Sequence, residues 1–260
     1  MGLLDERVVV VTGAGAGIGA AVADLAAAEG AAVAALDLDA DAAAATAERL
    51  RAAGAEASAH QVDVGDLASV RAAVADVESR HGRLDGVANV AGVVRYGAVT
   101  DLDEADWDLQ IDTNLKSVYL MARFAIPVMR RAGGGAVVNT ASAQAFASQP
   151  LVAAYSASKA GVVSMTRTLA LDHAADGIRV NCVCPGSVET PMLRYGAELL
   201  AAGTPAEETM QSWGAQHPLG RLIQPVDVAE VVVFLLSDKS RAVTGSSYLV
   251  DAGLTARLGV

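Results

Sequence analysis

A tyrosine and a lysine stand four residues apart, at Tyr155 and Lys159, and Ser142 lies thirteen residues before the tyrosine. On a helix, side chains at that four-residue spacing share a face and can meet. An ammonium group close to a phenol favours the phenolate, so the pair would lower the pKa of Tyr155 from its usual value of about 10. A phenol shifted in this way can act as a general acid–base near neutral pH. Chance also produces this spacing on exposed helices, so the significance of the pair depends on what surrounds it.

A glycine-rich octet, Thr-Gly-Ala-Gly-Ala-Gly-Ile-Gly at residues 12–19, follows a β-branched run at residues 8–11. An alanine-rich stretch over residues 17–29 then predicts a helix that ends near Gly30. Strand, glycine turn and helix in this order form phosphate-binding loops, because glycine lets the backbone approach a pyrophosphate and the helix start offers free N–H groups. The octet therefore indicates a dinucleotide site, although a chain with 25 glycines also produces such an octet by chance.

A second apolar strand ends at Asp37, about 20 residues beyond the start of the loop. A carboxylate in this place can bind both hydroxyls of an adenosine ribose, and it would repel a 2′-phosphate. Leu38 follows it and Ala14 lies inside the loop, so neither position supplies a cation for NADP. The sequence thus favours NAD. In the alternative interpretation Asp37 caps the next helix, but Asp39 and Asp41 are better placed for that role.

Apolar runs and helical stretches alternate along the rest of the chain. Strands are expected at 56–62, 84–88, 136–141 and 248–250, and helices at 66–80, 104–131, 155–175 and 225–236. Such alternation indicates right-handed βαβ units around one parallel sheet, whose ligands lie beyond the carboxyl ends of the strands. Asp63, Asn89 and Ser142 fall at those ends, although Asp63 is as well placed to cap the following turn.

Composition excludes several classes of protein. The 260 residues carry a net charge of −11, which argues against a nucleic-acid partner. No apolar run approaches the roughly 20 residues of a membrane span, and the acidic N-terminal segment rules against a secretory signal, so we expect no membrane partner and a cytoplasmic location. The histidines are scattered without ligand spacing, so no metal site is expected. Cys182 and Cys184 would point to one face of a strand as buried thiols.

Taken in order, these residues resemble the single-domain type of the short-chain dehydrogenase/reductase family. Val90 and Ala252 depart from its pattern, where asparagine and glycine are more usual. The resemblance implies an α/β fold of one domain over residues 1–260, a three-layer αβα Rossmann fold with seven doubly wound parallel strands in the order 3-2-1-4-5-6-7. The matching motifs span nearly the whole chain and comprise Thr12-Gly13-x-x-x-Gly17-x-Gly19, Asn89-x-Ala91-Gly92, Asn114, Ser142, Tyr155-x-x-x-Lys159, Pro185-Gly186 and Thr190.

The resemblance also implies a role for each matched residue. Tyr155 would take the proton from a substrate hydroxyl, Lys159 would assist it and hold the nicotinamide ribose, and Ser142 would hydrogen-bond the substrate oxygen. Asn114, a poor residue for a helix interior, would hold a water in a proton relay from Lys159 to solvent. Hydride would pass between the substrate carbon and NAD. The implied cofactor-binding residues are Thr12, Gly13, Gly17, Ile18, Gly19, Asp37, Asp63, Val64, Asn89, Ala91, Gly92, Tyr155, Lys159, Pro185, Gly186, Val188 and Thr190.

Residues 191–218 lie where the family places its substrate lid, an insertion expected to be mobile. They and nearby loops suggest a moderately polar pocket with one apolar wall, suited to a small polyol, sugar or cyclic hydroxy-ketone. For every candidate an ordinary packing or surface role is at least as plausible. The family usually forms homotetramers, which we expect here as well. The candidate substrate residues are Arg95, Gln144, Phe146, Gln149, Met192, Tyr195 and Trp213.

The expected function is therefore NAD-dependent interconversion of a secondary alcohol and a ketone. A 3-oxoacyl carrier-protein reductase is the alternative among enzymes, but Asp37 disfavours NADP and the net charge disfavours an acidic carrier. A non-catalytic NAD-binding regulator is the alternative from another class, and it would typically have lost Tyr155 or Lys159. A serine hydrolase would need a Gly-x-Ser-x-Gly elbow, and Ser142 lacks those glycines.

Overall fold

The computed structural model describes residues 2–201 and 203–257. In this range the β-branched runs form one seven-stranded parallel sheet in the order β3-β2-β1-β4-β5-β6-β7. The expected doubly wound sheet and its strand order are thus confirmed. The strands are β1 (Val8–Thr12), β2 (Ala32–Asp37), β3 (Ala57–Gln61), β4 (Gly86–Asn89), β5 (Gly135–Thr140), β6 (Ile178–Pro185) and β7 (Ser247–Val250).

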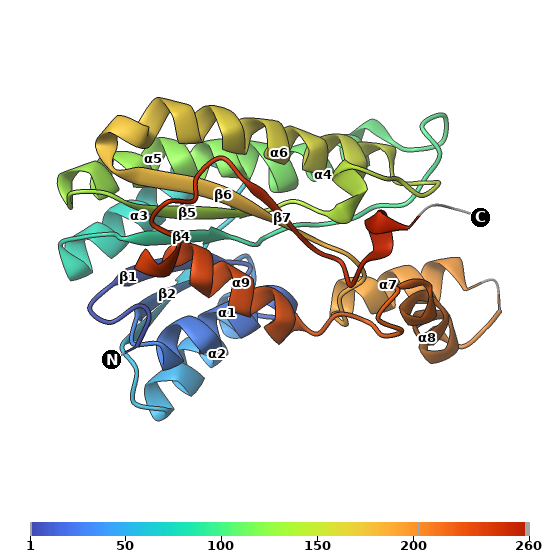
Figure 1. Cartoon of the computed structure of the whole chain (residues 1–260), viewed down its shortest axis with the longest axis horizontal. Coiled ribbons are helices and arrows are strands. Elements are labelled where there is room, and N and C mark those ends of the chain that lie inside the picture. The colour runs from blue at the N-terminus through green and yellow to red at the C-terminus, as the bar shows by residue number, and fades with distance from the viewer. Residues whose placement is uncertain (1, 202, 258–260) are drawn as a thin grey trace.

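Helices cover both faces of the sheet, which makes three layers (Figure 1). One face carries α1 (Gly17–Ala28), α2 (Ala40–Ala52) and α9 (Pro225–Leu236). The other carries α3 (Leu67–His81), α4 (Glu104–Ile111), α5 (Ser117–Arg131) and α6 (Ala153–His173). Successive strand residues enter opposite cores: Val9 and Val11 pack with α1 and α9, whereas Val8 and Val10 pack with α3 and α5. Burial on both faces explains why β1 is apolar without alternation.

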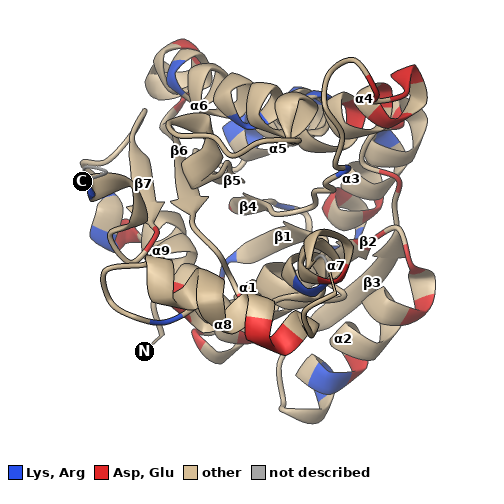
Figure 2. Cartoon of the chain, turned by 90° about the vertical axis from the view of Figure 1, so that its right-hand side faces the viewer, with Lys and Arg blue, Asp and Glu red and all other residues tan. Residues whose placement is uncertain are grey.

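Two helices of the insertion after β6 lie apart from the three layers, at the end of the sheet where the strands finish (Figure 1). They are α7 (Pro191–Leu200) and α8 (Ala206–Gln216). Thr190 caps α7, because its Oγ1 accepts the N–H of Leu193 at 3.3 Å. After α8 the chain returns to the point where the insertion began, and the N–H of Ile223 donates there to the carbonyl oxygen of Ser187 at 3.0 Å. In Figure 2, which views this end of the molecule, α7 and α8 stand in front of the strand ends.

The long helix expected over residues 104–131 is present as α4 and α5 joined by a π-helical turn, Asp112–Lys116. A π-turn adds one residue to the helical ladder, and such turns are frequent at functional sites. Asn114 lies in the middle of this turn and is buried. None of the described helices is long and apolar enough to cross a membrane. The described residues also contain no group of His, Cys, Asp and Glu side chains suited to a metal ion.

Candidate active site

The glycine loop lies between the end of β1 and the start of α1, with its backbone close to neighbouring chain. Gly13 has a φ of +66°, and a Cβ there would lie 2.9 Å from the Cα of Ala91. The N–H groups of Val90 and Ala91 donate to the Oγ1 of Thr12 at 3.0 and 3.1 Å, which ties the loop to the end of β4. Ala16 caps α1 without any side-chain hydrogen bond. The first N–H groups of α1 are therefore free of a side-chain cap and suited to an anionic ligand.

Asp37 ends β2 beside this loop. Its Oδ2 accepts the N–H of Gly15 at 2.8 Å, and its Oδ1 accepts the N–H of Asp39 at 3.0 Å. Asp39 is the residue that caps α2, because its Oδ1 accepts the N–H groups of Asp41 and Ala42. The capping role is thus filled by another residue. The Asp37 carboxylate remains at the sheet edge where an adenosine ribose binds in folds of this kind.

Tyr155 and Lys159 lie near the start of α6, one turn apart on the same face. The Lys159 Nζ is 5.6 Å from the centre of the Tyr155 ring and donates to the carbonyl oxygen of Thr140 at 2.8 Å. Ser142 follows β5 and is buried, and its Oγ accepts the N–H of Gln144 at 3.1 Å. The carboxyl end of β5 and the start of α6 therefore bring the three side chains to one place, since Ser142, Tyr155 and Lys159 line the same cavity.

The pKa values of this pair correct the expectation from spacing. Burial raises the pKa of Tyr155 to about 12, against the opposing effect of the Ser142 side chain, and the nearby Tyr96 raises it further. Burial lowers the pKa of Lys159 to about 8, although the Cys184 and Cys182 thiols act in the other direction. Helical spacing brought the two side chains together, but desolvation outweighs their attraction because both groups leave water. The phenol therefore keeps its proton at neutral pH.

Asn114 acts as a clamp in the π-turn. Its Oδ1 accepts the N–H of Val93 at 2.8 Å, and its Nδ2 donates to the carbonyl oxygen of Val93 at 2.9 Å and to the Oγ of Ser158 at 3.2 Å. Gly92 fits between this amide and the lysine, because a Cβ there would lie 3.1 Å from the Asn114 Oδ1 and 3.4 Å from the Lys159 Nζ. The Asn114 side chain thus holds the loop after β4 against α6 beside Lys159.

A cavity of about 440 Å³ extends from the start of α1 to Tyr155 and the insertion. Among the described residues that line it there is no Asp, Glu or Arg, and Lys159 is its buried cation. Of the cofactor-binding set predicted from sequence, the residues on this cavity are Ile18, Gly92, Tyr155, Lys159, Pro185, Gly186, Val188 and Thr190.

The other members of that predicted set lie around the cavity. Asp63 closes a local turn, with its Oδ1 accepting the N–H of Gly65 at 2.8 Å, and Val64 beside it is buried. The Nδ2 of Asn89 donates to the Oδ1 of Asn139 at 2.8 Å, which links β4 to β5 below the cavity. Thr12, Gly13, Gly17, Gly19 and Ala91 form the loop and its support. The Sγ atoms of Cys182 and Cys184 lie 3.9 Å apart, both buried and free, on one face of β6 as expected.

The structure divides the candidate substrate residues. Gln144, Gln149, Met192 and Trp213 line the cavity. Phe146 is 54% exposed, so its ring faces solvent. Arg95 turns away from the cavity toward α4, where its Nε lies 3.5 Å from the Oδ1 of Asp106. Tyr195 does not line the cavity but packs against a residue that does, Tyr96, with ring centres 6.3 Å apart.

The loop after β4 explains why Tyr96 was missed and Arg95 chosen. Residues 90, 92, 94 and 96 line the cavity, while the intervening positions are tied to the body of the protein. The N–H of Arg95 donates to the Oε1 of Gln110 at 3.0 Å, and the N–H of Gly97 donates to the carbonyl oxygen of Leu151 at 2.9 Å. An extended chain alternates its side chains between two sides. A one-residue error in register therefore exchanges Tyr96 for Arg95.

His217 is a second residue that sequence reasoning missed, and it joins the insertion to the loop after β6. Its Nδ1 lies 2.9 Å from the carbonyl oxygen of Trp213, and its Nε2 lies 3.2 Å from the N–H nitrogen of Ser187. The neutral ring with the proton on Nδ1 satisfies both contacts, because Nε2 then accepts. His217 is 2% exposed. His217 directly follows α8, where a polar side chain can reach the carbonyls that end the helix.

Comparison with known proteins identifies the relatives of this arrangement. Residues 13–255 match the family described as enoyl-(acyl carrier protein) reductase. The chain is 40% identical over 203 residues, 78% of each sequence, to 2-(S)-hydroxypropyl-CoM dehydrogenase 3 of Xanthobacter autotrophicus. The solved structure of levodione reductase matches with a TM-score of 0.94 at 32% identity, covering 98% of this chain and 100% of that one. Aldohexose dehydrogenase of Thermoplasma acidophilum matches with a TM-score of 0.89 at 33% identity, covering 99% and 97%.

Proposed function

The chain belongs to the short-chain dehydrogenase/reductase family and is an oxidoreductase acting on CH–OH groups, and on that premise we propose that it is an NAD-dependent dehydrogenase of small, uncharged secondary alcohols. The observation that carries the proposal is the meeting of Ser142, Tyr155 and Lys159 on a cavity that also reaches the start of α1. A regulator without catalysis would have no need for a buried lysine beside the phenol of Tyr155, because burying an ammonium group costs stability.

The residues present fit a nicotinamide dinucleotide. Gly13, Gly15 and Gly17 form a cradle that a side chain would fill, since a Cβ at each would lie 2.9, 2.6 and 3.0 Å from its nearest neighbour. The uncapped start of α1 would hold the pyrophosphate, and Asp37 would bind the adenosine ribose hydroxyls and repel a 2′-phosphate. Lys159 would hold the second ribose. The adenine would lie by Asp63 and Val64, and the nicotinamide by Asn89, Gly92, Pro185, Gly186, Val188 and Thr190.

Proton transfer is the task of the chain's own residues. Because the pKa of Tyr155 is raised to about 12, the phenol is protonated at neutral pH and is able to donate to the oxygen of a ketone. In alcohol oxidation the same oxygen takes the hydroxyl proton as phenolate, a form whose population grows as the pH rises toward the Tyr155 pKa of about 12. Ser142 positions the substrate oxygen by a hydrogen bond in a site sheltered from water. The bound nicotinamide supplies the hydride or accepts it. Lys159 and the Asn114 clamp then stand on the route by which the proton reaches solvent.

The cavity supports an uncharged substrate. A carboxylate, phosphate or sulfonate inside it would lose its hydration without a guanidinium partner, which is costly. The insertion above it is acidic on its outer side, with Glu207 and Glu208 in the first turn of α8 (Figure 2). Residues 191–218 are proposed to form the lid over this substrate. Levodione reductase and aldohexose dehydrogenase are named for a dione and a sugar, which agrees with the polyol, sugar or hydroxy-ketone class.

A substrate bound to an acyl carrier protein is the alternative, because the description of the matching family names such a carrier. An acidic carrier protein would have to approach a surface that carries Glu198, Glu207 and Glu208. The cation Arg194 cannot offset this charge fully, because it is already paired with Glu207. Like charges at a docking surface slow association. A free small molecule is the better fit.

An initial-rate screen tests the proposed function. The purified chain should reduce NAD in the presence of at least one polyol, aldose or cyclic alcohol, and its kcat/KM for NAD should exceed that for NADP. Hydroxyacyl thioesters serve as the comparison class and should react more slowly. Reduction of neither cofactor by any alcohol, or a higher kcat/KM with NADP, would contradict the proposal.

A further inference from the structure

Tyr96 and Tyr155 line the same cavity. Tyr96 also contributes to the raised pKa of Tyr155. Tyr96 is itself partly buried, and burial followed by the neighbouring Tyr195 raises its own pKa, so its hydroxyl keeps its proton. Within the described residues no side chain or backbone group forms a hydrogen bond with this hydroxyl. Tyr96 thus adds to the wall of the cavity that contains the proposed acid–base a hydroxyl that is free to donate.

The position of Tyr96 is rigidly determined. The amide of Asn114 clamps Val93 on one side, and the backbone bond from Gly97 to Leu151 holds the other. Gly97 also forms an isolated parallel bridge with Val152, just before α6. The loop is thus attached to both the π-turn and the helix that carries Tyr155. The ring of Tyr195 packs beside the Tyr96 ring, with ring centres 6.3 Å apart.

Gly196 in α7 is the residue that makes room for this ring. A Cβ at Gly196 would lie 2.5 Å from the Tyr96 hydroxyl oxygen, 3.2 Å from Cζ and 3.5 Å from Cε2. Distances below 3.0 Å force atoms to move, so an alanine here would push the hydroxyl away from α7. Glycine in a helix interior costs about 1 kcal/mol relative to alanine. The small residue is retained on a buried face of the insertion, where close approach of Tyr96 accounts for it.

Resting on the dehydrogenase function above, we propose that Tyr96 is a specificity-determining residue whose hydroxyl binds a second oxygen of the substrate, next to the reacting carbon, and that Gly196 sets its position. The substrates it selects are uncharged vicinal diols and hydroxy-ketones. A simple alcohol in the cavity would cover the Tyr96 hydroxyl without giving it a partner, and an unpaired buried polar group is costly. Sites built to hydrogen-bond a substrate hydroxyl discriminate strongly against analogues that lack it.

The test compares cis-cyclohexane-1,2-diol with cyclohexanol, which differ by that one hydroxyl. In the parent enzyme, kcat/KM with NAD should be at least about tenfold higher for the diol. Tyr96→Phe should remove most of this preference by lowering kcat/KM for the diol about tenfold or more, with less than about a threefold change for cyclohexanol. Tyr195→Phe is the matched control and should keep the preference, because its ring packs on Tyr96 but does not line the cavity.

Gly196→Ala tests independently whether Gly196 sets the position of the Tyr96 hydroxyl. Alone it should lower kcat/KM for the diol about tenfold, whereas in the Tyr96→Phe background it should cost less than about twofold, because the clashing oxygen is gone. Binding of NADH and the thermal midpoint, measured for every variant, report whether the fold and cofactor site are intact. Equal parent activity on both alcohols, or an equal loss on both in Tyr96→Phe, overturns the role of Tyr96. A parent enzyme that oxidises neither alcohol removes the proposed substrate class, and this inference with it.

Discussion

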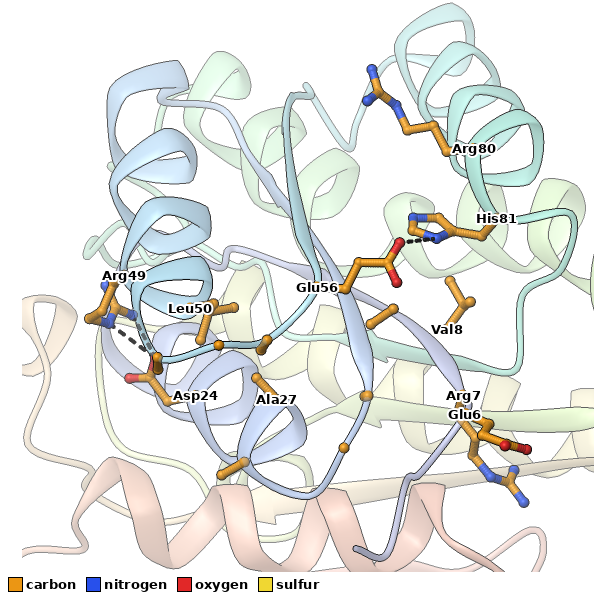
Figure 3. A pocket seen from close by; sticks show the side chains of 17 residues that line it. Glu6, Arg7, Val8, Asp24, Ala27, Arg49, Leu50, Glu56, Arg80 and His81 are labelled. Atoms are coloured by element: carbon orange, nitrogen blue, oxygen red, sulfur yellow. Dashed lines mark hydrogen bonds and ion pairs between the residues drawn. The ribbon is translucent and has the colours of Figure 1, made fainter.

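The two ends of the sheet carry hollows that differ in size and in chemistry. At the carboxyl ends lies the cavity of about 440 Å³ with Ser142, Tyr155 and Lys159. At the amino ends of β1, β2 and β3 lies a larger hollow of about 920 Å³ (Figure 3). In the larger one Arg49 pairs with Asp24 at 2.9 Å, and the Nδ1 of His81 lies 3.2 Å from a carboxylate oxygen of Glu56.

The smaller cavity is lined by a lysine, Lys159, and by two tyrosines. Lys159 is 3% exposed and has no carboxylate partner among the residues that line the cavity, and two half-buried phenols, Tyr96 and Tyr155, line the same space. Buried ionisable groups with shifted pKa values mark functional sites, because a fold retains such costly groups only where they are used. A buried ammonium group without a carboxylate partner, rather than the volume of the hollow, therefore locates the site.

Replacing Lys159 should produce the largest loss of turnover among these variants. It also separates the catalytic role of the buried ammonium from its cost in stability. In Lys159→Met, kcat should fall at least about 100-fold because the ammonium that supports proton transfer and the nicotinamide ribose is lost. Lys116→Met, at an exposed residue paired with Asp112, is the matched control and should keep full activity. Equal kcat values in the Lys159 variant and the parent would show that the buried charge has no catalytic use.

The same variant should reveal the stability cost of the buried charge. The pKa of Lys159 is lowered from 10.5 to about 8, so between these values the unfolded chain binds the proton that the folded chain has released. Wild-type stability therefore rises with pH in this window, and below about pH 8 the ammonium costs about 3 kcal/mol. The gain in unfolding free energy of Lys159→Met over wild type should shrink by about 2 kcal/mol between pH 7 and pH 10, measured by urea denaturation. A difference in unfolding free energy between the variant and wild type that does not change with pH would contradict the lowered pKa of Lys159.

Cofactor choice should respond to Asp37 more modestly. Asp37→Ser removes the carboxylate that repels a 2′-phosphate, so the ratio of kcat/KM for NAD over NADP should fall about tenfold or more. Asp39→Ser is the control two residues away. It alters the cap of α2 and should leave the cofactor ratio unchanged. A ratio that shifts equally in both variants would argue that the loop as a whole, not Asp37, sets the preference.

A substitution in the larger hollow should have the smallest effect on activity. Arg49→Ala breaks an ion pair whose two side chains are each about half exposed, and such pairs contribute about 0–1 kcal/mol. Turnover and kcat/KM should stay within about twofold of wild type. A tenfold loss of activity would mean that the amino-end hollow has a function, and the contrast between the two ends would then fail.

Sequence reasoning predicted the parts of this site that depend on strand order. Thr12 and Asp37 end β1 and β2, and Ser142 follows β5. Parallel strands bring their carboxyl ends to one edge of the sheet, so the placement of all three residues at that edge could be foreseen. Tyr155 and Lys159 share a helix face for the same kind of reason. The alternation of strands and helices predicted one parallel sheet, and the family resemblance implied the strand order that the structure confirms.

What could not be predicted depends on local register and on burial. One residue of register in an extended loop separates Tyr96, on the cavity, from Arg95, which turns to Asp106. The π-turn at Asn114 changes which side chains face α6, and no periodic pattern announces it. Spacing alone suggested a lowered pKa for Tyr155, because desolvation, the dominant cause, is known only once the surrounding chain is in place.

The most direct test of the account is the turnover of Tyr155→Phe together with its affinity for NADH. Removal of one hydroxyl oxygen should lower kcat at least about 1000-fold in both directions, because proton transfer to and from the substrate is lost. The dissociation constant for NADH, followed by nicotinamide fluorescence, should stay within about twofold of wild type. Residual turnover above a tenth of the wild-type value, with NADH still bound, would contradict the assignment of Tyr155 as the acid–base.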